Sequence, residues 1–441
     1  MPEPTNARAK MLDAGDPLAG YRARFDVPEG VIYLDGNSLG CLPSATPARL
    51  EQVVREQWGR DLIRSWNAAG WIDMPARVGA KIAPLIGAQP HEVIACDSTS
   101  VNLFKLISAA LGMQPGRKVV LSEPGNFPTD IYMIEGLEKQ GLAERRLASR
   151  DRLVEALDED VALLLLTHTH YKTGELFDMA ALTRAAHAAG ALVLWDLSHS
   201  GGALPVDLNG CEADFAVGCG YKYLNGGPGA PAYAFVAGRH LEAARQPLSG
   251  WMGHAAPFAF SDDYAPAPGI EQILCGTPPI LGLAALEVGV ELIAEIGVDR
   301  LCAKSQKLSE FFRQCLAEKA LSPSGERVGR GEEAQQPDDS PTPQPPPLKG
   351  RGSVLDLVSP PDPAQRGSQL SFRHPEAYAI CQALIARGVI GDFRDPDILR
   401  FGFAPAYLRF EDMAEAARHL TEVLDAGEWQ AEEYRTRAAV T

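Results

Sequence analysis

The sequence predicts an α/β fold, with a mostly parallel sheet in a large domain and a smaller α+β domain after it. Between residues 118 and 218, short apolar runs alternate with amphipathic stretches, which is typical of parallel strands joined by crossover helices. Polar residues follow three of these runs, at 123–130, 167–173 and 196–200. Because the carboxyl ends of parallel strands meet at one edge of a sheet, we expect these segments to surround one ligand.

The composition is that of a globular protein. A chain of 441 residues, 46 % of them hydrophobic, can bury a sizeable core. The net charge of −16 argues against binding to nucleic acid or anionic membranes. No signal pattern or membrane-length apolar run is visible, so we predict a cytoplasmic location. The eight cysteines include no Cys-x-x-Cys pair, which favours buried thiols over disulfides or a zinc site.

The N-terminal part begins with a polar, partly helical stretch to about residue 30. Residues 31–40 are typical of a short strand that runs into a turn rich in glycine, asparagine and serine, and a helix is predicted from about 45 to 58. The turn fits an ordinary connection as well as it fits a ligand loop.

Hydroxyl residues at 98–100 come directly before an apolar helical pattern. Such residues cap the free N–H groups of a helix, and the same N–H groups can seat a phosphate. Capping is the commoner use, and these residues alone leave both interpretations open.

The alternating region continues in order along the chain. Its predicted elements are strands at 118–121 and 161–166, helices at 127–140 and 178–189, and two strands that end at Asp196 and near Gly218. Pro278 and Pro279 open a long helical pattern to about 296, which we interpret as the connector to the smaller domain.

The C-terminal part is interrupted by a proline-rich segment. Residues 322–352 cannot form a packed core, and we expect them to be a disordered insertion. The elements predicted after it are an ordered segment at 368–373, a helix at 375–387, a strand at 398–403 and a helix at 410–426. Arg400 lies in the last strand, where a guanidinium fits either a substrate carboxylate or a structural ion pair.

Two residues at the predicted strand ends indicate a cofactor. Asp196 stands where an acid can keep a pyridine nitrogen protonated, and Lys222, after the next strand, can form a Schiff base with an aldehyde. Together they indicate a pyridoxal-phosphate pocket. Each residue alone is read more simply as a helix cap or a surface lysine. His168 and His170 have a spacing that metal ligands can have, but no third ligand is suggested nearby and no metal is predicted.

Several motifs resemble the kynureninases, and more closely their bacterial form. They occur in the family's order and are Gly36–Gly40, Asn126–Asp130, Asp196–His199, Tyr221–Asn225, Gly250–His254 and Thr277–Ile280. The resemblance covers nearly the whole chain apart from the proline-rich segment. It implies the aspartate-aminotransferase-like fold type I, pyridoxal 5′-phosphate as cofactor and a homodimer with shared active sites.

The resemblance also implies a reaction and a set of site residues. The reaction is hydrolysis of L-kynurenine to anthranilate and L-alanine in tryptophan catabolism, with Lys222, Tyr221 and Asp196 as catalytic residues. The cofactor-binding residues implied are Thr99, Ser100, Phe127, Asp130, Thr167, Asp196, His199, Tyr221 and Lys222, with Trp251 and Thr277 from the neighbouring subunit. The substrate-binding residues implied are Asn37, Ser38 and Arg400.

Two departures from the animal members bear on the substrate. Where those members carry a histidine, this chain has the segment 64–71, and Thr277 stands in place of an asparagine. Both favour kynurenine over 3-hydroxykynurenine.

The alternative to this predicted function is another fold-type-I activity, such as that of a cysteine desulfurase or an aminotransferase. The expected division is a segment at 1–60 that joins the small domain, a cofactor-binding domain at 61–296 and a small domain at 297–441.

Overall fold

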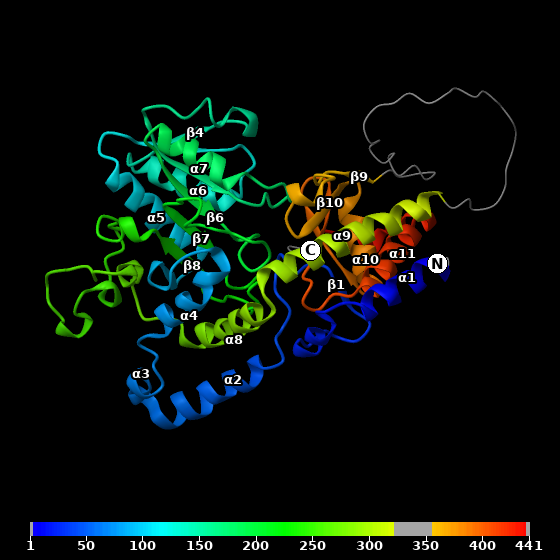
Figure 1. Ribbon diagram of the computed structural model, residues 1–441, viewed down its shortest axis with the longest axis horizontal. Helices are drawn as coiled ribbons and strands as arrows, with labels where there is room; N and C mark the ends of the chain where they lie inside the picture. Colours follow the sequence, from blue (N-terminus) through cyan, green and yellow to red (C-terminus); the bar gives the residue numbers. More distant parts are fainter. Residues whose placement is uncertain (1–2, 322–354, 438–441) are drawn as a thin grey trace, which may run out of the picture.

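The computed structural model describes residues 3–321 and 355–437. Figure 1 shows two bodies side by side, each built on its own sheet. The larger sheet has the order β2-β8-β7-β6-β5-β3-β4. Its strands are β2 (Val93–Ala95), β3 (Val119–Ser122), β4 (Glu144–Leu147), β5 (Val161–Thr167), β6 (Leu192–Asp196), β7 (Phe215–Gly218) and β8 (Tyr233–Val236).

The larger sheet is parallel except at β8, which runs antiparallel to both of its neighbours. The register pairs Thr167 of β5 with Asp196 of β6, and Asp196 with Val217 of β7. The ends of these three strands therefore lie next to one another. The predicted mostly parallel sheet is confirmed, with β8 as the exception.

Strand β5 shows why the sheet forms a layer with helices on both faces. All of its residues are buried. Leu163 and Leu165 belong to one apolar cluster, and Leu164 and Leu166 belong to another. Alternate side chains point to opposite faces of a strand, so an uninterrupted apolar run fits a strand that is covered on both sides.

Helices from different parts of the chain cover the two faces. On one face, α5 (Thr99–Met113) and α6 (Pro128–Lys139) pack through the cluster that contains Leu163. On the other, α4 (Met74–Ile82), α7 (Met179–Ala188) and α8 (Ile280–Ile296) pack through the cluster that contains Leu164.

The smaller body is built on an antiparallel sheet of order β12-β13-β10-β9. Its strands are β9 (Asp356–Leu357), β10 (Gln369–Arg373), β12 (Asp392–Arg394) and β13 (Ile398–Gly402). Its helices are α9 (Val298–Leu321), α10 (Ala377–Ala386), α11 (Phe410–Ala426) and α12 (Glu432–Arg435). Phe312 of α9 contacts Phe401 of β13 with 5.2 Å between ring centres.

The N-terminus joins this smaller body. Helix α1 (Glu3–Ala14) packs on α11, where the two carboxylate oxygens of Asp13 accept hydrogen bonds from the backbone N–H groups of Phe410 and Glu411 at 2.7 and 2.9 Å. The short strand β1 (Ile32–Tyr33) pairs in parallel with β11 (Val389–Ile390). The N-terminal segment and the domain boundaries at residues 60 and 296 remain a prediction.

The helix predicted at 45–58 is present, but only its first part is an α-helix. Helix α2 (Thr46–Gln52) continues without a break into a wider π-helical segment, Val53–Asp61, and is followed by α3 (Ser65–Ala68). The proline-rich insertion predicted at 322–352 lies outside the described residues. In the described part of the chain, every helix is too short or too polar to cross a membrane.

Candidate active site

Lys222 lies in the loop after β7 and is only 7 % exposed. Its Nζ is 5.6 Å from the centre of the Phe127 ring and 5.8 Å from that of Tyr221. Burial raises the pKa of Tyr221, and the neighbouring Cys219 thiol acts in the same direction, so the phenol keeps its proton at neutral pH. The structure therefore places an amine beside a protonated phenol and an aromatic ring.

The turn at 36–40 packs directly on this loop. The backbone N–H of Gly40 donates to the carbonyl of Tyr221 at 2.7 Å. A Cβ on Gly40 would lie 2.3 Å from the carbonyl oxygen of Lys222, so no larger residue fits. The predicted ligand loop is thus in contact with the lysine loop.

Asp196 ends β6 and is 1 % exposed. One of its carboxylate oxygens accepts from the Ser198 backbone N–H at 2.7 Å and from the Ser198 hydroxyl at 2.5 Å. Burial raises the pKa of Asp196, while the Ser198 hydrogen bonds and the charge of Lys222 oppose the rise. The arrangement fixes one oxygen of a buried carboxylate and makes a cationic partner favourable.

A second buried acid lies beside the first. The Thr167 hydroxyl is 2.5 Å from Asn126 Oδ1 and 3.1 Å from Asp130 Oδ2. Burial, and then the charge of Asp196, raise the pKa of Asp130 well above its usual value. Within the described residues, Asp130 Oδ1 is buried and has no hydrogen-bond partner. An unpartnered buried polar atom of this kind is costly unless a ligand satisfies it.

Helix α5 presents its N-terminus to the same region. Ser98 is the N-cap, and its hydroxyl accepts from the Val101 N–H at 3.3 Å. The cap is thus supplied by Ser98, while Thr99 and Ser100 occupy the first helical positions, and the phosphate seat stays a prediction. Thr99 Oγ1 lies 3.3 Å from Cys219 Sγ, which in turn lies 3.1 Å from Ser198 Oγ. Through Cys219, the start of α5 is therefore in contact with Ser198, which donates to Asp196.

His199 connects the two bodies. It is 4 % exposed, and its Nδ1 lies 3.1 Å from Oε1 of Gln369, a residue of β10. Burial lowers the pKa of His199 well below its usual value, and the charges of Lys222 and Arg400 act in the same direction. The imidazole is therefore neutral, and the tautomer with its proton on Nδ1 donates to Gln369 Oε1.

Arg400, from β13, reaches the same region and is 1 % exposed. Its Nη1 donates to the Tyr171 carbonyl at 2.7 Å, and its Nη2 donates to the Ser38 hydroxyl at 2.9 Å and to Asp392. With the Asn37 amide oriented to satisfy both of its ends, Asn37 accepts from Arg400 Nε at 3.2 Å. The three predicted substrate residues thus form one cluster.

Trp251 and Thr277 are exposed to solvent in a single chain. Trp251 is 38 % exposed and contacts the ring of Phe258, with 5.7 Å between ring centres. Thr277 is exposed just before α8. Their predicted role in the neighbouring subunit's site stays a prediction.

The residues present fit pyridoxal phosphate. Asp196 suits a pyridine nitrogen, Lys222 suits an aldehyde, and Phe127 offers a ring face. The free N–H groups at the start of α5 suit a phosphate. In the described part of the chain, no group of three or more His, Cys, Asp or Glu side chains could hold a metal ion.

Several residues that support the site were missed from the sequence. Ser198 stands two positions after Asp196, a spacing that is typical of a local turn and could have been noticed. Gln369, Asp392 and Cys219 give no such signal, because their contacts with His199, Ser38 and Thr99 join residues that are 170, 354 and 120 positions apart.

Comparison with protein families identifies two regions. Residues 65–327 match the family described as aminotransferase class-V, and residues 349–420 match the kynureninase C-terminal domain. A kynureninase of Burkholderia mallei is 48 % identical over 99 % of this chain and 100 % of its own length. A kynureninase of Pseudomonas fluorescens is 46 % identical over 98 % of both chains.

Solved structures show the same fold at low identity. A cysteine desulfurase of Thermococcus onnurineus superposes with a TM-score of 0.74 at 17 % identity, covering 92 % of this chain and 98 % of the other. One from Escherichia coli gives 0.70 at 19 %, covering 93 % and 98 %. These confirm the fold-type-I prediction and concern the fold alone. With its full-length similarity to curated kynureninases and both family matches, the chain belongs to the kynureninase family of class-V aminotransferase-like, pyridoxal-phosphate-dependent enzymes.

Proposed function

We propose that this protein hydrolyses the Cβ–Cγ bond of L-kynurenine, with pyridoxal phosphate as cofactor, to give anthranilate and L-alanine. The observation that carries the proposal is 48 % identity over the full length of a kynureninase. The cluster of Lys222, Asp196 and Arg400 supports it, because the three side chains suit an aldehyde, a pyridine nitrogen and an α-carboxylate. One water is consumed, and it supplies the hydroxyl of the new anthranilate carboxyl group.

The cofactor, when bound, supplies an electron sink for the pair that remains when a substrate bond breaks. We assign to Lys222 the binding of the cofactor aldehyde and then the movement of the proton at the substrate Cα. Its low exposure supports this role, since an enclosed amine meets little competing water.

Asp196 and Tyr221 have different protonation roles in this proposal. The ionised Asp196 keeps the pyridine nitrogen protonated, and two hydrogen bonds from Ser198 hold it in place. Tyr221, whose pKa is raised, retains a proton that it delivers to the substrate carbon released by the cleavage.

Arg400, Asn37 and Ser38 bind and orient the amino-acid end of the substrate. Hydrogen bonds from Arg400 to the Tyr171 carbonyl and Ser38 support a fixed guanidinium. Fixed orientation matters because a displacement of about 1 Å can cost roughly a hundredfold in rate. Thr277, in place of an asparagine, supports kynurenine over 3-hydroxykynurenine as the preferred substrate.

We further propose that the active form is a homodimer in which Trp251 and Thr277 complete the site of the partner. Several large apolar side chains near these segments support an interface, because they are otherwise exposed to water. Their exposed fractions are 57 % for Trp58, 59 % for Leu62, 76 % for Ile63 and 42 % for Leu281.

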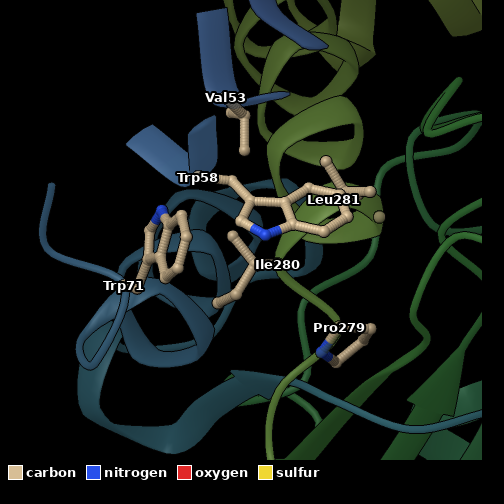
Figure 2. Close-up of a pocket in the computed structure, with 7 residues that line it drawn as sticks. Val53, Trp58, Trp71, Pro279, Ile280 and Leu281 are labelled. Carbon is tan, nitrogen blue, oxygen red and sulfur yellow. The ribbon is translucent and has the colours of Figure 1, made fainter. Parts of the chain in front are cut away.

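A pocket of about 390 Å³ at this surface also supports the proposed interface. Figure 2 shows Val53, Trp58 and Trp71 facing the start of α8, where Pro279, Ile280 and Leu281 lie. The α8 side of the pocket begins two residues after Thr277. We propose that a second copy of this chain covers this pocket.

We also keep the domain division at residues 60 and 296 as a proposal, supported by the pairing of β1 with β11.

The test is a direct assay. Purified protein with pyridoxal phosphate and L-kynurenine should release anthranilate, followed by its fluorescence, and alanine in equal amounts. A cysteine desulfurase or an aminotransferase would instead release alanine from cysteine, or transfer the amino group to a keto acid. Absence of anthranilate from protein that has bound the cofactor would refute the proposal.

A further inference from the structure

A second arginine lies beside Arg400 on the same face of the small sheet. Asp392 of β12 pairs with Arg400 of β13, and Arg394 follows Asp392 by two positions. Directly opposed residues and residues two apart share a face of a sheet. Gln369 and Ser371 of β10 lie on this face as well, and Gln369 contacts His199 of the large body. The face that carries Arg394 is thus the one turned toward the active site.

Asp392 holds both arginines through one oxygen. Its Oδ2 lies 2.8 Å from Arg394 Nη2 and is also bound by Arg400 Nη2. The Ser38 hydroxyl donates to the same oxygen at 3.1 Å. Since Asp392 is 1 % exposed, this contact fixes the spacing of the two guanidinium groups.

Arg400 has little hydrogen-bonding capacity left. Its contacts with Asn37, Ser38, Asp392 and the Tyr171 carbonyl use the Nε hydrogen, both Nη2 hydrogens and one Nη1 hydrogen. Within the described contacts, a single Nη1–H remains. A carboxylate that binds two parallel donors therefore needs a second group beside Arg400.

Arg394 is placed to be that group. Its side chain is 34 % exposed, against 1 % for Arg400, so its guanidinium can reach a ligand. Its positive charge opposes the rise that burial causes in the pKa of the Tyr171 and Tyr221 phenols, and it adds to the lowering of the pKa of His199. All three belong to the region around Lys222, which indicates that Arg394 faces the active site.

The two arginines also carry more charge than their neighbours balance. Asp392 contributes one negative charge against two guanidinium groups. Asp35 is the second acid near them, and burial, followed by the charge of Asp392, raises its pKa to about 7. At and below neutral pH the cluster therefore has a positive surplus that suits one carboxylate anion.

We propose that Arg394 is a second residue that binds the α-carboxylate of the substrate, with Asp392 as the positioning residue that spaces Arg394 and Arg400. This inference rests on the proposed function and deepens it. Arg394 then determines the preference for substrates that retain the α-carboxylate.

The first experiment compares Arg394→Gln with Arg373→Gln. Arg373 is a matched control because it lies on the same sheet, is 55 % exposed and is paired with Asp397 at 3.2 Å, but stands two strands away from Arg394. We expect Arg394→Gln to raise the KM for L-kynurenine by about 10- to 100-fold, the effect of one charge-assisted hydrogen bond. The kcat should change by less than about threefold if the loss falls on binding. Arg373→Gln should change neither parameter.

The second experiment uses the decarboxylated analogue of kynurenine as a competitive inhibitor. Its inhibition constant should be the same for the wild-type protein and Arg394→Gln, because it has no carboxylate. Arg394→Lys should recover part of the affinity for kynurenine, since it restores charge without the planar pair of donors. Asp392→Asn should raise the KM in the same selective way.

Three outcomes would overturn the inference. They are an unchanged KM in Arg394→Gln, an equal loss of affinity for the analogue, and a loss of kcat alone. Each is measured with a wild-type preparation that releases anthranilate, so failure of the inference is distinct from failure of the proposed function, in which the wild-type protein itself releases none.

Discussion

Ser198 donates both its backbone N–H and its hydroxyl to a single oxygen of the Asp196 carboxylate, at 2.7 and 2.5 Å. The Ser198 hydroxyl also accepts from the Cys219 thiol at 3.1 Å, and Cys219 contacts Thr99 at the start of α5. One short chain of contacts thus joins the acid proposed for the pyridine nitrogen to the helix proposed for the phosphate. Both ends of the proposed cofactor site are fixed relative to each other.

Ser198→Ala should weaken cofactor binding. The variant removes the hydroxyl bond but keeps the N–H bond, and a hydrogen bond to a charged group contributes about 1.5–3 kcal/mol. We expect pyridoxal phosphate to bind roughly tenfold more weakly or worse, measured by absorbance titration of the apoprotein.

The matched control is Ser44→Ala. Ser44 makes the same kind of bond to Asp26, at 2.7 Å, but at an exposed position. It should leave the dissociation constant unchanged. If Ser198→Ala binds pyridoxal phosphate as tightly as the wild-type protein does, the Ser198 hydroxyl does not support the cofactor site.

Asp35 should make substrate binding depend on pH. Its pKa is raised to about 7, by burial and then by the charge of Asp392. Arg400, Ser38 and Arg394 oppose this rise without cancelling it. As the pH rises through about 7, Asp35 ionises beside the arginines and competes with the substrate carboxylate. The kcat/KM for L-kynurenine should therefore fall above neutral pH, and Asp35→Asn should reduce that fall.

The raised pKa of Asp35 should also make the folded state less stable as the pH rises. An acid whose pKa is raised by folding favours the folded state below its unfolded pKa, near 4, and loses that contribution as the pH rises through its folded pKa. The wild-type protein should therefore lose more stability than Asp35→Asn between pH 5 and 8, measured by urea unfolding. Asp26→Asn, at an exposed site, serves as the control. Parallel curves for all three proteins would contradict the prediction.

The large sheet was predictable because its strands are buried on both faces. Strands such as β5 and β6 read as uninterrupted apolar runs, and the polar residues after them marked the edge where the site lies. Strand β4 was missed because it is an edge strand of sequence Glu-Arg-Arg-Leu, with little apolar signal. Strand β8 was not predicted, and its antiparallel direction depends on how the connecting chain returns, which local pattern does not encode.

The site was predictable to the extent that its residues follow strand ends or match motifs. Lys222 and Asp196 could be paired from spacing and chemistry, whereas Arg400 could be singled out from its strand but assigned to the substrate only through resemblance. The partners of Arg400 show why the rest was hidden. Tyr171 and Ser38 are separated from it by 229 and 362 positions, so only the packed structure brings them together.

Lys105→Met should destabilise the fold next to the proposed phosphate seat. The Lys105 side chain is completely buried, and its Nζ bonds Asp97 Oδ2 and the Ile273 carbonyl, each at 2.5 Å. The Asp97 carboxylate is 30 % exposed and partly solvated, but the buried Ile273 carbonyl loses its donor, so the variant should lose about 1–3 kcal/mol of stability. Urea unfolding of the apoprotein should show this loss.

Lys139→Met provides the comparison for Lys105. Lys139 is paired with Glu135 at 2.7 Å, but its side chain is 73 % exposed. Water screens such a pair, so this variant should unfold like the wild-type protein. A Lys105→Met protein as stable as Lys139→Met would show that the contacts of Lys105 do not stabilise this segment.

Complementation between two inactive variants should reveal a shared active site. In the proposed homodimer, Lys222 and Trp251 of one site come from different chains. A mixed dimer of Lys222→Ala and Trp251→Ala then has one site with both substitutions and one site with neither. Random exchange in an equal mixture makes half of the dimers mixed, so about one quarter of all sites are intact. The mixture, after unfolding and refolding together, should release anthranilate at about a quarter of the wild-type rate.

The pairing of Lys222→Ala with Asp196→Asn is the control that gives this result its meaning. Asp196 and Lys222 lie in the same chain's site, where the charge of Lys222 affects the pKa of Asp196. In their mixed dimer each site carries one substitution, so no intact site forms and no activity should return. Recovery in the first mixture alone indicates that Trp251 acts across the interface. If neither mixture exceeds its separate variants, although exchange is verified by mass, Trp251 does not serve the partner's site and its exposed ring needs another explanation.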